Sequence, residues 1–256
     1  IELLAGLVVG LLLGLLGSGG SIVTLPALVY IAGVDVKPAM AMTFGIVAIT
    51  AAFATIQHVW MGRVRLPVAA VFGVTGIGGT YLGARLGVWI PDSLQLMMFA
   101  SILLLAAWRM CASQPQQQVA IDSAPYDGQF SFKQPHIAVH GVIIGVLTGI
   151  VGVGGGFLIV PALVLLSGLS IRDAVGTSLV VVTLKSIAGF TGYVGAVDID
   201  YNMMIGFSLV AIIGSLAGAS LSNRISGEKL RVVFGVFLVL MASAILLESG
   251  IEILQS

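Results

Sequence analysis

Charged side chains are scarce in this sequence: Asp, Glu, Lys and Arg make up 9% of its 256 residues. Soluble domains carry about 25% charged residues. Hydrophobic residues reach 58%, and the mean hydropathy is +1.13. This composition excludes a soluble domain and indicates a membrane protein with several spans. The 11 basic and 11 acidic residues cancel, so the charge gives no reason to expect binding to nucleic acid.

Cysteine and catalytic motifs are equally sparse. Cys111 is the single cysteine, which excludes an internal disulfide and a thiolate metal site. The chain has no Gly-x4-Gly-Lys-[Ser/Thr] loop for ATP, no Gly-x-Ser-x-Gly and no His-Glu-x-x-His. An intramembrane hydrolase would need Ser18 beside a histidine base, whereas all the histidines are expected near the interfaces. We therefore expect neither an enzyme nor a cofactor.

Glycine is abundant, with 34 residues, and two glycine clusters stand in equivalent contexts. The first cluster is Gly17, Ser18, Gly19, Gly20 and Ser21. The second lies 135 residues later and contains Gly154, Gly155 and Gly156; at this offset, nine of the 21 positions from 14 to 34 are identical. Each cluster separates two apolar arms of about 20 Å, shorter than the roughly 30 Å hydrocarbon core. An interruption repeated in both halves of a membrane protein is typical of a transporter binding site.

The duplication covers nearly the whole chain and predicts an all-α polytopic membrane protein. We expect a first repeat of the transmembrane domain at 1–112, a polar linker at 113–135 and a second repeat at 136–256. Each repeat would hold a glycine-broken helical hairpin and three transmembrane helices. The expected helices cover 38–61, 67–90, 94–110, 172–195, 201–223 and 229–247. The first apolar run has no cationic start, so we expect a membrane segment and not a signal peptide.

The distribution of basic residues favours inverted repeats. If every broken segment crossed the membrane once, four basic loop residues would lie inside and six outside, against the positive-inside tendency. If each broken segment returns as a hairpin, eight lie inside, and only Lys37 and Arg85 lie outside. The alternative to these re-entrant hairpins is that the glycine-broken arms are short helices that span the membrane fully. Inverted hairpins would bring two helix N-terminal ends together near the midplane, as a site for a small anion.

Single polar residues complete the candidate site. Lys185 lies about 18 Å into its helix with no carboxylate at the same depth, so a bound anion would be its natural partner. Thr43, Thr177 and Ser178 are candidate hydroxyl donors near the starts of matching helices. Gln57 and His58 are candidates for coupling or gating near the inner end of their helix.

Each candidate has a structural alternative. Small residues at four-residue spacing, such as Gly6, Gly10 and Gly14, commonly mediate helix packing alone. Lys185 could extend to an interface or be neutral. Hydroxyls in membrane helices more often bond to their own backbone than to a ligand, and a histidine near an interface is more often structural.

The duplicated Gly-x-x-Gly-x-Gly-Gly and Pro-Ala-Leu blocks, each followed by a helix with Thr43 or Ser178 near its start, resemble the sulfite exporter TauE/SafE family. The resemblance implies a bacterial or archaeal plasma-membrane transporter for sulfite, sulfonates or sulfoacetate. It also implies a secondary carrier, coupled to protons, that hydrolyses no ATP. Ser18, Ser21 and Lys185 match no family motif, so their roles rest on physical argument.

These observations lead to one expected function with one main alternative. We expect a secondary transporter that moves a small sulfur-containing anion by alternating access, with its site between the two hairpins. A passive anion channel is the alternative, and it would have a continuous wet pore instead of an occluded site. The choice of anion, the direction of flux, the coupling ion and the oligomeric state stay open.

Overall fold

The computed structural model describes residues 2–16, 20–112, 135–153, 156–167 and 169–222, together with residues 232, 236, 239–243 and 245. The elements within these ranges are helices, which confirms the all-α prediction. Four helices are long and apolar enough to cross a membrane: Val36–Trp60, Leu66–Gly87, Ile171–Tyr193 and Tyr201–Leu221. The predicted linker and most of the predicted helix 229–247 lie outside the described residues.

The helices follow the apolar runs of the sequence. In the first half they are α1 (Glu2–Leu16), α2 (Gly20–Pro26), the π-helix η1 (Ala27–Ile31), α3 (Val36–Trp60), α4 (Leu66–Gly87) and α5 (Asp92–Ala112). In the second half they are α7 (Pro135–Val151), α8 (Gly156–Ser167), α9 (Ile171–Tyr193) and α10 (Tyr201–Ser222). Pro26 ends α2 where the chain widens into η1, because proline cannot donate the regular backbone hydrogen bond.

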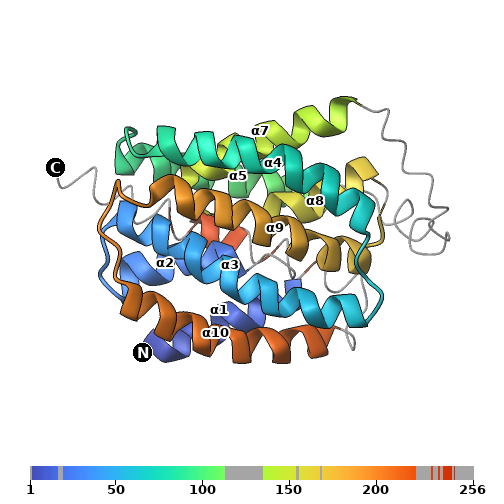
Figure 1. The fold of residues 1–256 in the computed structure, drawn as a ribbon, viewed down its shortest axis with the longest axis horizontal. Helices are drawn as coiled ribbons and strands as arrows, with labels where there is room; N and C mark the ends of the chain where they lie inside the picture. The colour runs from blue at the N-terminus through green and yellow to red at the C-terminus, as the bar shows by residue number, and fades with distance from the viewer. Residues whose placement is uncertain are drawn as a thin grey trace.

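Two equivalent helices, α3 and α9, run antiparallel through the centre (Figure 1). Near the start of α3, Met40 accepts a hydrogen bond of 3.6 Å from the hydroxyl of Tyr193, the last residue of α9. Just past the other end of α3, the Arg65 N–H donates to the Thr177 hydroxyl, 3.0 Å away, near the start of α9. Thr50 and Lys185, which are equivalent by the 135-residue offset, therefore lie at the same height, near the middle of the bundle.

The first arm of each half packs on a helix of the other half. In the first pair, α1 runs parallel to α10, with Gly10 against Ala211 and Gly14 against Ser215. In the second pair, α7 runs parallel to α4, and the contacts are Gly145 against Gly76 and Gly149 against Thr80. The two sets of contacts are equivalent, because each residue of one half is replaced by the residue 135 positions away in the other half. The two pairs flank α3 and α9 on opposite sides (Figure 1). Small residues allow this close approach of backbones.

These directions make each glycine-broken segment a hairpin. The helices α1 and α3 both begin at the end of the bundle where α10 begins, so α2 and η1 bring the chain back to its entry side. By the same reasoning α7 enters, and α8 returns, at the opposite end.

The first arm of the second hairpin reaches deep into the bundle. Gly152, directly after α7, has a φ of +73° and packs against Met40. Met40 lies ten residues before Thr50, about 15 Å from the middle of α3 at the helical rise. The end of α7 therefore passes the middle of the bundle, whereas the expectation concerned the N-terminal ends of the returning arms α2 and α8, which contact each other. The seventeen residues of α7 are long enough to pass the middle.

Candidate functional site

Lys185 is the charged residue buried at the centre of the molecule. Its side chain is 1% exposed, and its Nζ has no hydrogen-bond partner among the described residues. The aliphatic stem lies against Gly76 of α4. Lys185 sits at the level of Thr50, its equivalent residue in the first half. The predicted burial of this lysine within the bundle is correct.

No described carboxylate lies at this depth. The acidic residues in the described part of the chain occupy helix ends and loops: Glu2, Asp35, Asp92, Asp173, Asp198 and Asp200. An unpaired ammonium buried in a membrane protein is costly, and such residues commonly mark the path of an ion or substrate. Among the described residues, the lysine is therefore a buried positive group without a protein counter-charge.

The buried hydroxyls fall into two groups. Ser178 donates to the Val175 carbonyl at 2.8 Å, and the Thr177 hydroxyl accepts the Arg65 N–H, so both candidate hydroxyls make contacts within the protein. The Thr43 hydroxyl is buried and has no partner among the described residues. Thr80 and Ser186 share this property, and the sequence reasoning did not identify them. Their residue type alone gave no signal, because serine and threonine in helices usually bond to their own backbone.

The glycine clusters lie partly outside the described residues. Gly17, Ser18, Gly19, Gly154 and Gly155 belong to this group. Gly20 and Gly156 are the first residues of α2 and α8, so each returning arm begins at its cluster, as predicted. Ser21 is fully buried on α2.

Gln57 and His58 lie near the end of α3, beside α1 and α10. The Gln57 amide donates to the Ser220 hydroxyl at 2.9 Å. The His58 side chain is 0% exposed and lies near the Gly14 backbone, yet neither ring nitrogen makes a hydrogen bond of good geometry to a described residue. His58 lies in the last turn of α3, and α1 and α10 cover this turn. The equivalent residue of the second half is Tyr193, which is also fully buried.

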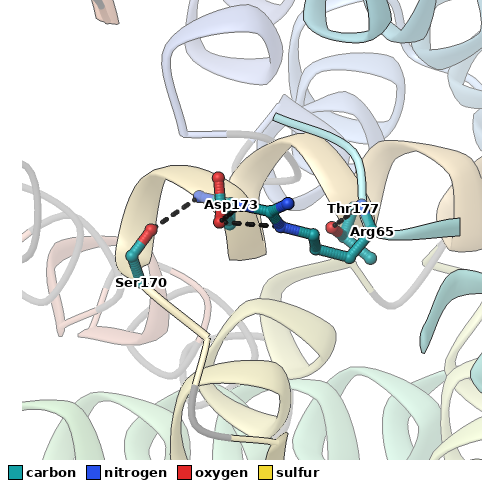
Figure 2. A network of polar contacts seen from close by, with 4 residues as sticks. All are labelled: Arg65, Ser170, Asp173 and Thr177. Carbon is teal, nitrogen blue, oxygen red and sulfur yellow. Dashed lines mark hydrogen bonds and ion pairs between the residues drawn. The ribbon is translucent and has the colours of Figure 1, made fainter. Parts of the chain in front are cut away.

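An ion pair joins the two halves at the end of the bundle where α3 ends (Figure 2). The Arg65 guanidinium donates to Asp173 Oδ2 from Nη2 at 2.7 Å and from Nε at 3.0 Å. Ser170 caps α9 by accepting the Asp173 N–H at 3.1 Å. Burial lowers the pKa of the nearby Arg63 guanidinium, the charge of Arg172 lowers it further, and Asp173 raises it. Asp173 is thus a carboxylate shared by a cluster of arginines.

This cluster was missed at the sequence level. The Ser170-x-x-Asp173 spacing is a signal for a helix start and could have located the cap. The ion pair spans 108 residues, so no local pattern could have predicted Arg65 as the partner. Among the described residues, no group of three or more His, Cys, Asp or Glu could hold a metal ion.

Comparison with known proteins places this architecture among membrane transporters. The family described as Sulfite exporter TauE/SafE matches residues 2–245. A protein of Xylella fastidiosa (strain 9a5c) named "Probable membrane transporter protein" is 32% identical over 247 residues, covering 93% of this chain and 91% of that protein. "Probable membrane transporter protein MJ0441" of Methanocaldococcus jannaschii is 27% identical, covering 96% of this chain and 94% of that protein. No solved structure gives a significant match.

Proposed function

Because the chain belongs to the sulfite exporter TauE/SafE family of membrane transporters, we propose that it is a secondary transporter for a small sulfur-containing anion of the sulfite, sulfonate or sulfoacetate type. The observation that carries this proposal is the buried Lys185 ammonium without a partner among the described residues. The anion neutralises this charge while it is bound. The oxygens of the anion accept hydrogen bonds from the ammonium, and these bonds offset most of the free-energy cost of burying the charge.

In this proposal, transport proceeds by alternating access between inverted halves. The antiparallel packing of α3 and α9 supports the inversion, because equivalent helices of parallel repeats would run in the same direction. Lys185 lies at the middle level, where access from either side is equally distant. A site at the middle of two inverted repeats fits the general plan of secondary transporters. Thr43 and the residues of the glycine clusters remain candidate contacts, and Gln57 and His58 remain candidates for coupling.

The ends of the bundle differ in charge, which supports one orientation. Counting only the residues that the structure describes, the end where α3 finishes carries Arg63, Arg65, Arg109 and Arg172 against one acid, Asp173. The opposite end carries Lys37 and Arg85 against five acids: Glu2, Asp35, Asp92, Asp198 and Asp200. The positive-inside tendency places the arginine end in the cytoplasm.

Single cysteines at positions 65 and 200, introduced with Cys111 replaced by Ser, test this orientation. Their accessibility to a membrane-impermeant thiol reagent is measured in right-side-out cells and in inverted vesicles. We expect the cysteine at 200 to react in cells and the cysteine at 65 to react in inverted vesicles. Reaction of both from the same side contradicts the inverted arrangement.

The transport proposal is tested with purified protein in proteoliposomes, by uptake and binding of sulfite, sulfoacetate and taurine. Uptake is expected to saturate and to show exchange with unlabelled substrate. Lys185→Gln is expected to weaken binding by about 10- to 100-fold, the usual loss for a hydrogen bond to a charged group. Its thermal stability should be unchanged or higher, because a buried charge without a partner has been removed.

Lys37→Gln is the matched control, because Lys37 is partly exposed and pairs with Asp92 at 3.5 Å at the opposite end of the bundle. We expect it to leave affinity unchanged. Undiminished affinity in folded Lys185→Gln would remove the lysine from the site. Flux that rises without saturation would favour the channel alternative.

A further inference from the structure

Gly76 provides the space that the long side chain of Lys185 occupies. A Cβ atom added at Gly76 would lie 2.8 Å from Cδ of Lys185, 3.1 Å from Cγ and 3.2 Å from Cε. Such distances are too short for ordinary contact, so even alanine would force the stem to move. The lysine is therefore positioned by α4, and its stem crosses the α4–α9 interface at this glycine.

The equivalent positions on α3 and α10 have the opposite combination of residue sizes. Thr50 stands where the second half has Lys185, and Ala211 stands where the first half has Gly76. The long side chain of Lys185 lies against the residue without a Cβ, whereas the positions equivalent to this pair hold a short side chain and a residue with a Cβ. This difference in residue size indicates that the α4–α9 interface is shaped around the lysine.

Thr80 lies one turn beyond Gly76 and shows a second difference between the halves. Its side chain is 0% exposed, and its hydroxyl has no partner among the described residues. The equivalent residue Ser215 is also fully buried, but its hydroxyl donates to the Ile212 carbonyl at 2.8 Å. The hydroxyl is thus unsatisfied on α4, the helix that packs against the lysine, and satisfied on α10, the equivalent helix of the other half.

The two unsatisfied groups belong to one small region. Residues four apart on a helix share a face, with about 5–6 Å between their Cβ atoms. Cε of Lys185 is in contact with the Gly76 position, and Thr80 follows on the same face of α4 one turn later. A buried polar group without a partner is costly, and two that lie close together favour a common ligand.

We propose that the anion binds at the α4–α9 interface, with one oxygen accepting from Lys185 Nζ and another accepting from the Thr80 hydroxyl. This site rests on the proposed transport function and deepens it. Two donors at separate positions select an anion with at least two acceptor oxygens, as in sulfite or a sulfonate group, over a halide. Gly76 acts as a positioning residue that keeps the ammonium in reach.

Thr80→Val tests the site, because valine keeps the shape and removes the hydroxyl. The measurement is the affinity of purified, folded protein for sulfite, with chloride as the single-atom anion for comparison. Thr80→Val is expected to weaken sulfite binding by about tenfold, the lower end of the range for a hydrogen bond to a charged group. Chloride binding should change little. Thr80→Ser, which keeps a hydroxyl, should retain the sulfite affinity of the unmodified protein. Ser215→Ala, at the equivalent position, should also leave this affinity unchanged.

Gly76→Ala is a second, independent variant in case Thr80→Val does not fold. We expect it to weaken sulfite binding by shifting the lysine stem, while Ala211→Gly has no effect on affinity. If Lys185→Gln loses sulfite binding while folded Thr80→Val and Gly76→Ala keep it, the α4–α9 site is overturned and the transport proposal stands. If saturable transport is absent altogether, the transport proposal fails first.

Discussion

The two halves of the molecule share their backbone packing and differ in their buried polar side chains. Gly10 on Ala211 repeats as Gly145 on Gly76, with the same register and direction. At equivalent places, however, Lys185 corresponds to Thr50 and His58 corresponds to Tyr193. Close helix contacts constrain residue size in both halves alike, whereas a binding group is needed only once near the middle of the bundle. The symmetric residues therefore indicate architecture, and the asymmetric ones indicate chemistry.

The largest effects are expected from the glycines that the halves share. At Gly145 an added Cβ would lie 2.7 Å from the Gly76 carbonyl oxygen, and at Gly10 it would lie 2.7 Å from Ala211 Cα. Valine at either position must push two backbones apart, so we expect Gly10→Val and Gly145→Val each to lose more than about 3 kcal/mol of stability. The folded fraction in detergent and the thermal midpoint measure this loss.

Gly78→Ala and Gly206→Ala are the controls, because nothing lies within 4 Å of a Cβ added at these glycines. Both are expected to be neutral or slightly stabilising, since alanine favours the helix. Similar losses for Gly10→Val and Gly145→Val would sharpen the comparison of the halves. If the protein tolerates one of these two valine substitutions and not the other, the two halves do not share their backbone packing in energetic terms.

A smaller effect is expected at the ion pair that one end of the bundle has and the other lacks. Arg65 corresponds to Asp200 in the second half, and Asp173 corresponds to Pro38 in the first, so the equivalent pair cannot form. Asp173→Asn should destabilise more than Arg65→Gln, because it leaves both Arg63 and Arg65 without the carboxylate that stabilises their charges. A coupling of about 1 kcal/mol is expected, because Arg65 is partly exposed to screening.

Thermal midpoints of the two single variants and the double variant give this coupling energy. Asp200→Asn serves as the control at the opposite end, where the carboxylate accepts the exposed Met203 N–H at 3.0 Å. A loss for Asp200→Asn as large as that for Asp173→Asn would contradict the difference between the ends.

The sequence predicted what depends on local pattern. Apolar runs located α3, α4, α5, α9 and α10 to within a few residues, and the distribution of charge identified Lys185 as a buried cation without a carboxylate. The depth of α7 could not be predicted, because it depends on packing against α4 and not on the length of the apolar arm.

The hydroxyl contacts show a different limit. Thr80 and Ser215 are the same type of residue at equivalent positions, and only their three-dimensional surroundings distinguish a satisfied from an unsatisfied hydroxyl. The Arg65–Asp173 pair likewise joins residues far apart in the chain. Such contacts have no local sequence signature, so they become visible only with the structure.

The exchange of first arms between the halves also sets the order in which the molecule can be assembled. Helix α1 leaves the ribosome first, but its packing partner α10 follows about 200 residues later, as the contact of Gly10 with Ala211 requires. At about 5–20 residues per second, α1 waits some 10 to 40 s for that partner. During this interval its glycine face is covered only by lipid. The first half therefore cannot complete its packing alone, because the surface that α1 packs against belongs to the second half.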